Sequence, residues 1–147
     1  MKRMLETHSA EETYALGKSF GEKAGPGQII CLEGDLGTGK TVFAQGFGEG
    51  LGIREIINSP TFTIISIYES GRIPLYHFDV YRIEDPDEMD EIGYEDYFYG
   101  NGVVLIEWAS RVRELIPENA VWAEISKDPE KGDDYRRIVI TGEEKSC

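Results

Sequence analysis

The 147-residue sequence has few of the features that mark secreted or membrane-bound proteins. It has two cysteines, Cys31 in a predicted strand and Cys147 at the last position, so no disulfide framework is implied. Its longest apolar runs are far shorter than a bilayer span, and residues 1–6 lack the apolar centre of a signal peptide. We therefore expect a cytoplasmic protein with no disulfides and no membrane partner.

Positive charge is also scarce, because 15 Lys and Arg stand against 28 Asp and Glu, which gives a net charge of −13. A phosphate backbone repels such a chain, so we expect no independent binding of nucleic acid. The acidic surface either confers solubility or meets a basic protein partner, and composition leaves both explanations open. The tetrapeptide N-K-x-D, which reads guanine in GTPases, does not occur.

One motif indicates a nucleotide site. Residues 34–41, GDLGTGKT, fit the phosphate-loop (P-loop) pattern G-x-x-x-x-G-K-[ST] and follow an apolar run typical of a buried strand. Glycines let backbone N–H groups approach phosphate oxygens, Lys40 would reach the β- and γ-phosphates, and Thr41 would bind Mg²⁺. The residues expected to bind nucleotide here are Gly34, Gly37, Thr38, Gly39, Lys40 and Thr41.

The rest of the pattern predicts one domain, residues 1–147, with an α/β fold. We expect a three-layer P-loop NTPase-like domain with a mixed β-sheet flanked by helices, because strand-like hairpins interrupt the α/β alternation. A capping box at Ser9 should open a helix that carries Tyr14, Leu16 and Phe20 inward. Further helices are predicted at residues 40–50, from an N-cap at Asp85, at 92–98 and at 109–115.

Glu107 follows four apolar residues, 103–106, which predict a buried strand. Ligands of open α/β sheets bind at the carboxyl edge of the strands, so Glu107 is the candidate acid for a magnesium site beside Thr41. The alternative is a strand-end glutamate that faces solvent.

Asp79 ends another apolar strand, and alternation places it on one face with His77 and Tyr81. One interpretation is an acid that positions the attacking water or accepts from a metal-bound water. The other is a surface hydrogen-bond cluster that fixes the hairpin.

Thr61 and Thr63 follow Ser59-Pro60 on a predicted loop. They would form a switch that senses Mg²⁺ and the γ-phosphate, or else an ordinary turn with β-branched residues. The motifs also leave room for a small-metabolite kinase whose acceptor pocket is lined by Tyr81, Arg82 and Arg111. A nucleotide-dependent binding module without turnover is the third possibility.

Taken together, four motifs resemble the TsaE (YjeE) family of small bacterial P-loop ATPases, which are required to form threonylcarbamoyladenosine in tRNA. The motifs are GDLGTGKT at residues 34–41, SPTFT at 59–63, HFDVYR at 77–82 and LIEW at 105–108. The resemblance implies binding of ATP and Mg²⁺ and weak hydrolysis by the isolated protein. It also implies action on the TsaB–TsaD heterodimer, which carries out the transfer itself.

The resemblance also assigns roles to residues. Lys40, Thr61, Asp79 and Glu107 become the catalytic set, with Thr61 in the switch loop and Glu107 as the magnesium-associated acid, with Trp108 beside it. The helix start near Ala10 resembles the family's adenine-side contact. A basic residue near the nucleotide falls on Arg136 or Arg137, and the resemblance does not separate them.

Overall fold

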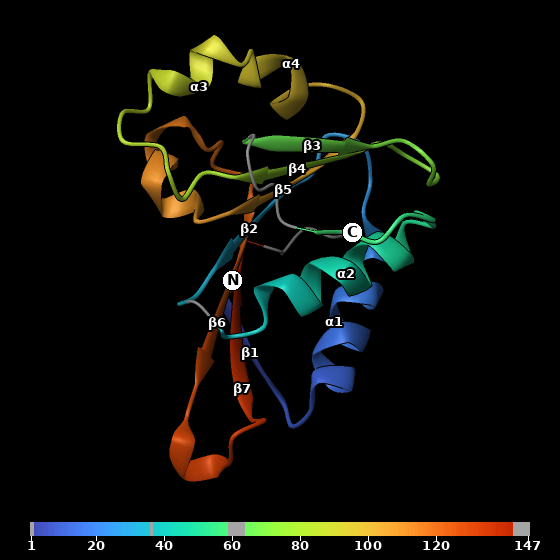
Figure 1. Cartoon of the computed structure of the whole chain (residues 1–147), viewed down its shortest axis with the longest axis vertical. Coiled ribbons are helices and arrows are strands. Elements are labelled where there is room, and N and C mark those ends of the chain that lie inside the picture. Colours follow the sequence, from blue (N-terminus) through green and yellow to red (C-terminus); the bar gives the residue numbers. More distant parts are fainter. Residues whose placement is uncertain (1, 36, 59–63, 143–147) are drawn as a thin grey trace.

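The computed structural model describes residues 2–35, 37–58 and 64–142, which form a mixed sheet between two helical layers (Figure 1). The described part contains seven strands in the order β1-β7-β6-β2-β5-β4-β3. They are β1 (Lys2–Thr7), β2 (Ile29–Glu33), β3 (Ile65–Tyr68), β4 (Leu75–Asp79), β5 (Val103–Glu107), β6 (Val121–Lys127) and β7 (Arg136–Thr141). The predicted three-layer α/β architecture with a mixed sheet is confirmed.

The helices cover both faces of this sheet. They are α1 (Ala10–Lys23), α2 (Lys40–Gly50), α3 (Glu88–Glu91) and α4 (Tyr94–Phe98), with two 3-10 helices, η1 (Ala109–Leu115) and η2 (Pro129–Lys131). In the described part of the chain, no helix is long and apolar enough to span a bilayer.

The P-loop strand, β2, occupies the middle of the sheet, parallel to β5 on one side and to β6 on the other. β4 is parallel to β5, with Asp79 paired to Glu107. Antiparallel strands complete the sheet: β7 and β1 lie beyond β6, and β3 lies beyond β4. The carboxyl ends of β2, β5 and β4 therefore meet at one edge, where the loop after β2 begins.

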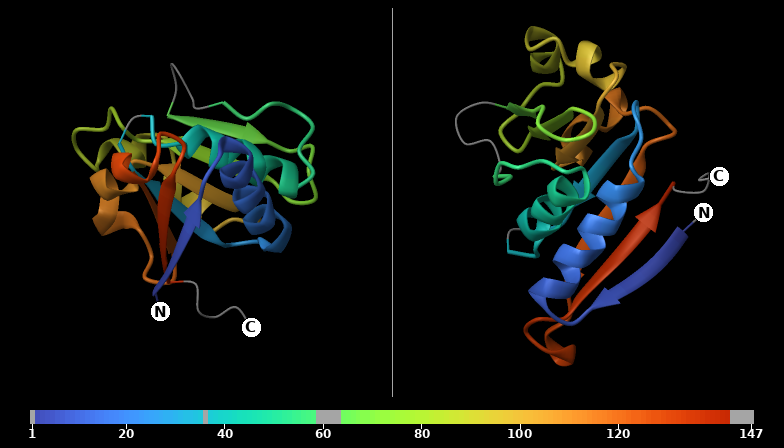
Figure 2. Two further views of the ribbon diagram at one scale, coloured as in Figure 1. Left: turned by 90° about the horizontal axis from the view of Figure 1, so that it is seen from below. Right: turned by 90° about the vertical axis from the view of Figure 1, so that its right-hand side faces the viewer.

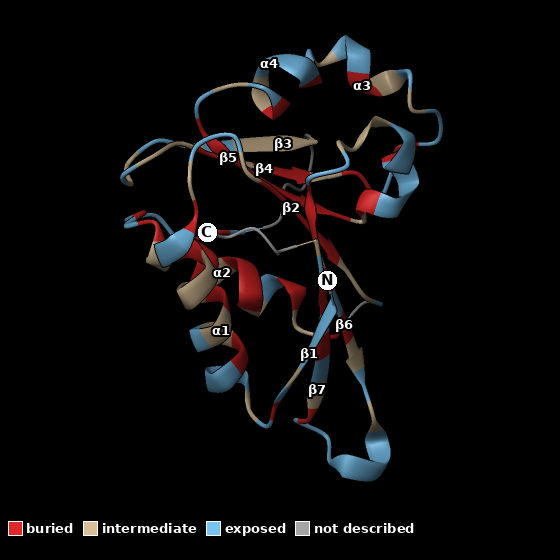
Figure 3. Ribbon diagram, turned by 180° about the vertical axis from the view of Figure 1, so that it is seen from behind, coloured by how far each residue is buried: buried red, intermediate tan, exposed pale blue. Residues whose placement is uncertain are grey.

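Alternation along β2 sends its side chains into two separate cores. Ile30 and Leu32 join the core beneath α1 and α2, which lie side by side on one face (Figure 2). Ile29 and Cys31 join the core on the opposite face, together with residues of α3, α4 and η1. Burial is concentrated along the central strands and the inner helix faces (Figure 3).

The inner face of α1 differs from the prediction. Its buried positions are Thr13, Gly17 and Gly21, whereas Leu16 and Phe20 pack only partly against the core. Tyr14 reaches across to α2 and donates its hydroxyl to Glu49. Small residues therefore form the closest contact between the two helices, and the Phe20 ring adds a contact to the Phe43 ring, with centres 5.6 Å apart.

Backbone-to-backbone packing explains the four glycines of this seam. A Cβ at Gly17 or Gly21 would lie 2.2 Å from a carbonyl oxygen of α2, that of Phe43 or Phe47. From the other side, a Cβ at Gly46 would lie 2.0 Å from the Tyr14 carbonyl oxygen, and one at Gly50 would meet that of Lys18 at 2.2 Å. The seam fixes the first turns of both helices relative to each other.

Two predicted helices take other forms. The capping acid Glu88 accepts the backbone N–H of Glu84 and of Asp85, so residues 85–87 form a turn and α3 begins only at Glu88. The segment after β5 is the 3-10 helix η1, broken at Val112. Tertiary contacts hold η1 in place, since isolated helices this short are marginal in water.

Candidate functional site

A cavity of about 510 Å³ opens at the carboxyl edge of the sheet, above β2, β4 and β5. The P-loop, the first turn of α1 and the start of β7 enclose it. Its lining residues are Ser9, Ala10, Thr13, Gly37, Thr38, Gly39, Lys40, Thr41, Val42, Asp79, Glu107, Trp108, Asp134 and Arg136. The structure thus gathers at one place residues that are up to 127 positions apart in the sequence.

The P-loop has the geometry of an anion site at its junction with α2. The N-cap of α2 is Gly39, which has φ 107° and makes no side-chain cap, so this end retains backbone donors for a ligand. Gly34 is needed for close approach, because a Cβ there would lie 2.5 Å from the Ile125 carbonyl oxygen of β6. Thr38 is buried and donates its hydroxyl to the Asp35 carbonyl at 2.9 Å.

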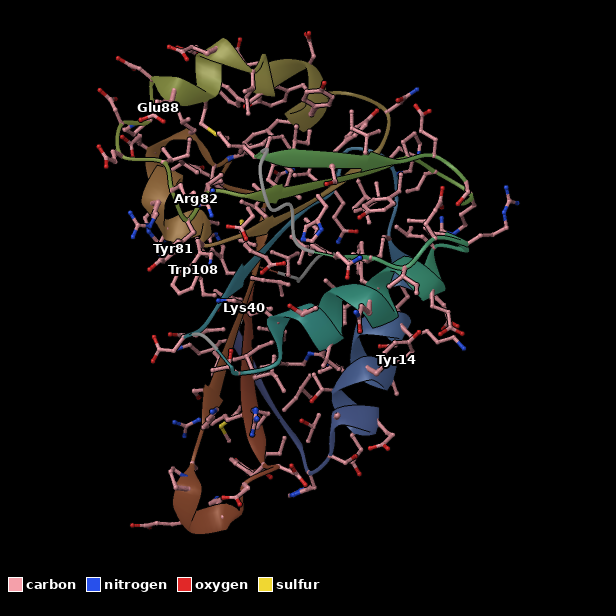
Figure 4. All side chains as sticks on the ribbon, in the orientation of Figure 1. Tyr14, Lys40, Tyr81, Arg82, Glu88 and Trp108 are labelled. Atoms are coloured by element: carbon pink, nitrogen blue, oxygen red, sulfur yellow. The ribbon has the colours of Figure 1, made fainter. Side chains whose placement is uncertain are left out.

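Lys40 is almost fully buried at the base of the loop, with 6% of its surface exposed. Its ammonium donates to the Gly34 carbonyl and lies 3.6 Å from the centre of the Trp108 ring (Figure 4). Burial lowers the pKa of Lys40, and the nearby carboxylates, Glu107 first among them, act in the opposite direction. An ammonium group in this position would bind an anion more strongly than it binds the neutral carbonyl of Gly34.

Trp108, which the family resemblance placed beside Glu107, makes contacts here that the motifs did not indicate. It is the one non-glycine residue of the described part with a positive φ, 64°, a conformation that costs on the order of 1–3 kcal/mol. Its ring packs on Tyr81, with ring centres 4.8 Å apart, and so bridges Lys40 and the surface (Figure 4). Its backbone N–H donates to the Leu32 carbonyl of β2 at 3.2 Å, and Glu33 accepts the N–H and the hydroxyl of Ser110, two residues further on.

The two candidate acids lie side by side on neighbouring strands. Glu107 is 3% exposed, so the solvent-facing alternative is wrong, and its Oε2 lies 2.8 Å from Nε2 of His77. His77 is fully buried, which also excludes a surface cluster. Asp79 is bonded at 3.0 Å to the Tyr81 N–H, and burial raises the pKa of its carboxyl. Both acids therefore line the cavity from its floor.

The basic residue near the P-loop is Arg136. Its guanidinium donates to the carbonyls of Thr38, Asp133 and Tyr135, each at 2.7–2.8 Å, and it lines the cavity. Arg137 is exposed and absent from the lining. Register explains the difference, since alternate residues of β7 face opposite sides of the sheet.

Ala10 and Thr41 also lie where the sequence placed candidate contacts, in the cavity wall, and the Thr41 residue is exposed there. A metal held by the Thr41 hydroxyl and the Glu107 carboxylate would take its remaining ligands from water and phosphate, as Mg²⁺ does. Ser9, Thr13 and Asp134 line the cavity without having been predicted to contact nucleotide. Ser9 was predicted only as a helix cap, and only the fold brings the three residues to the P-loop.

The predicted switch residues Thr61 and Thr63 lie outside the described residues. Of the arginines considered for an acceptor pocket, Arg111 has structural partners: it lies over the Tyr81 ring and contacts the Ile83 carbonyl.

Comparison with known proteins places this site in a family. A family model described as the threonylcarbamoyl adenosine biosynthesis protein TsaE matches residues 7–138. The tRNA threonylcarbamoyladenosine biosynthesis protein TsaE of Bacillus subtilis is 50% identical over 135 residues, which cover 92% of this chain and 82% of that protein. The Treponema pallidum protein of the same name is 43% identical over 115 residues, which cover 78% of this chain and 84% of the relative.

A solved structure agrees with these sequence relatives. The crystal structure of Bacillus subtilis YdiB superposes with a TM-score of 0.82 at 42% identity, covering 95% of this chain and 84% of that one. The match extends over the sheet and both helical layers, and the family model spans every lining residue of the cavity. The chain belongs to the TsaE family of threonylcarbamoyl adenosine biosynthesis proteins.

Proposed function

We propose that this protein is a magnesium-dependent ATPase that serves the formation of threonylcarbamoyladenosine in tRNA through a TsaB–TsaD complex. The observation that carries the proposal is the buried ammonium of Lys40, held at the base of a P-loop between a carbonyl and an aromatic ring. Two carboxylates and the uncapped start of α2 face the same cavity. This combination suits a nucleoside triphosphate and its metal better than any uncharged ligand.

Four side chains of the cavity would take part in phosphoryl transfer. Lys40 would exchange the Gly34 carbonyl for phosphate oxygens, which bind a cation more strongly. Thr41 and Glu107 would hold magnesium, directly or through its water, and the bound ion would neutralise charge on the phosphates. Asp79, whose raised pKa brings it nearer to the range of a proton acceptor, would orient the attacking water.

Arg136 supports the expectation of slow turnover by the isolated protein. It is the one arginine among the described residues that line the cavity, and its guanidinium is bonded to three main-chain carbonyls. Stabilising the P-loop in this way leaves the developing charge without an arginine finger, a device that raises rates by about 10³–10⁵. We therefore propose that the partner complex supplies or orders the missing element.

The surface near the cavity supports a basic partner. Residues 84–96 carry eight carboxylates and no Lys or Arg, and all but Glu88 are exposed. This acidic segment follows Tyr81 and Arg82 and extends from the site across α3 and α4 (Figure 4). Opposite charge on TsaB–TsaD would speed association and fix its orientation.

Phosphate release without any acceptor tests the catalytic proposal. We expect slow release by the isolated protein that requires Mg²⁺ and rises when purified TsaB–TsaD is added. Release only in the presence of a small-molecule acceptor would indicate a kinase. Binding of ATP without phosphate release, with or without TsaB–TsaD, would indicate a binding module without turnover.

Partner binding in defined nucleotide states tests the regulatory half. Affinity for TsaB–TsaD should be highest with a non-hydrolysable ATP analogue and lower with ADP or no nucleotide. The reason is that the γ-phosphate, which only the ATP state has, would set the conformation that the partner binds. Affinity should also fall as salt rises, since charges are screened over about 10 Å at 0.1 M salt. Equal affinity in the three nucleotide states would contradict the proposed switch. An affinity that does not change with salt would contradict the proposed role of the acidic segment in partner binding.

A further inference from the structure

His77 is a buried side chain that the proposed chemistry leaves without a role. It lies in the middle of β4, fully buried, with Leu105 of β5 and Ser66 of β3 as its strand partners. Since alternate residues of a strand share a face, His77 and Asp79 point to the same side of the sheet as Leu105 and Glu107. β4 and β5 run next to each other in the sheet (Figure 1).

This placement brings the imidazole against the candidate magnesium acid. His77 Nε2 and Glu107 Oε2 are 2.8 Å apart, and both side chains are buried. An ionised carboxylate only accepts hydrogen bonds, so the proton of this bond belongs to Nε2. This hydrogen bond uses one oxygen of the Glu107 carboxylate and fixes the rotation of the group. The carboxylate still has acceptor sites for other partners.

The second ring nitrogen makes no competing contact. Nδ1 is buried and has no hydrogen-bond partner among the described residues. The hydrogen bond that holds the ring in the described part of the chain is therefore the one between Nε2 and Glu107.

Orientation matters at Glu107 because a second acid lies beside it. Asp79 is its strand partner, and the two carboxylates line one cavity. A carboxylate held by a fixed donor directs its remaining acceptor sites to one side, where a metal ion would lie.

We propose that His77 is a positioning residue for magnesium: its Nε2–H holds the Glu107 carboxylate in a fixed orientation, turned toward the P-loop. This inference rests on the proposed magnesium-dependent function. It follows the general behaviour of partners behind metal ligands, whose loss costs about 10- to 100-fold in metal affinity or activity. His77 itself touches neither nucleotide nor metal.

Paired amide substitutions separate a positioning role from a packing role. Glutamine places its amide nitrogen where the imidazole has Nε2, whereas asparagine places it near Nδ1, away from Glu107. We expect His77→Asn to raise the half-saturating Mg²⁺ concentration for phosphate release by about 10- to 100-fold. His77→Gln should keep this concentration close to the wild-type value. The affinity for ATP without Mg²⁺ should change less than twofold in both variants.

An unrelated core substitution provides the control. Ile138 is equally buried but lies on β7, and Ile138→Val should leave the Mg²⁺ requirement unchanged. Wild-type Mg²⁺ dependence in a folded His77→Asn variant would overturn the inference while the proposed function stands. Phosphate release by the wild-type protein that needs no divalent ion would overturn both, and the wild-type arm alone reveals it.

A measurement on the unmodified protein keeps the inference testable if the variants do not fold. Nitrogen-15 spectra of the two histidine rings distinguish the tautomers, and His8 is identified by its loss in a His8→Gln variant. We expect Nε2 of His77 to carry a proton in the absence of nucleotide. A proton on Nδ1 with none on Nε2 would overturn the inference, because His77 could not then donate to Glu107.

Discussion

Gly46→Ala is the substitution whose effect follows most directly from the backbone seam between α1 and α2. The added methyl would lie 2.0 Å from the Tyr14 carbonyl oxygen and 3.0 Å from the Lys18 backbone nitrogen. The first distance is about 1.4 Å shorter than ordinary van der Waals contact. Both neighbours are main-chain atoms of a regular helix, so no side-chain rotation relieves the clash.

The expected loss is the difference between two opposing effects. Overpacking a core costs about 1–3 kcal/mol, whereas alanine in a helix interior is better than glycine by up to about 1 kcal/mol. We therefore expect the free energy of unfolding to fall by about 1–2 kcal/mol, which lowers the melting temperature by about 2–8 °C for a chain of this size. ATP affinity should fall too, because separating the helices also separates Ala10 from Thr41 across the cavity.

Thermal and urea unfolding measure this effect, and Gly25→Ala serves as the matched control. Gly25 lies outside the helices, and a Cβ there meets no atom within 4 Å. The control should unfold at or slightly above the wild-type temperature, since alanine restricts the unfolded chain. A Gly46→Ala protein as stable as the control would show that the helices do not depend on glycine contact.

Three further predictions concern the cavity. Thr41→Ala and Glu107→Ala should each lower Mg²⁺-dependent turnover at least about tenfold while changing nucleotide affinity less, as steady-state kinetics and calorimetry would show. Arg136→Ala should weaken ATP binding about tenfold, because charged hydrogen bonds that hold the P-loop are worth about 1.5–3 kcal/mol, whereas the exposed Arg137→Ala should match wild type in the same titration. Burial raises the pKa of Asp79, so its ionised form opposes folding at pH values above that raised pKa. Asp79→Asn should therefore raise the urea midpoint at pH 7, and the gain should vanish below pH 3.8, where the carboxyl is protonated in both states.

Local sequence signals were sufficient for the strands and the P-loop. The apolar run before residues 34–41 and the one before Glu107 each predicted a central strand, because parallel strands buried on both faces are continuously apolar. Both strands, and their shared edge, lie where this reasoning placed them. Ser9 caps α1 as predicted, accepting the Glu12 N–H at 3.1 Å, although Glu12 reaches back to the N–H of His8.

The features that were missed depend on contacts between distant segments. Nothing near Gly17 or Gly46 in the sequence indicates that two helices touch there, so the glycine contacts were not predicted. Likewise, Trp108 was expected beside Glu107, but no local signal indicates its positive φ or its ring contacts with Lys40 and Tyr81. Such features require the three-dimensional structure because each is set by several elements at once.

Equilibrium binding of ATP to the wild-type protein and to Lys40→Ala tests the central claim most directly. Lys40 lines the cavity, and removing its ammonium takes away the charge-assisted bond to the phosphates. By calorimetry in the presence of Mg²⁺, we expect the variant to bind ATP at least about tenfold more weakly, given about 1.5–3 kcal/mol for a charged hydrogen bond. Circular dichroism should show the same fold in both proteins. Wild-type ATP affinity in a folded Lys40→Ala protein would contradict the assignment of this cavity as the ATP site.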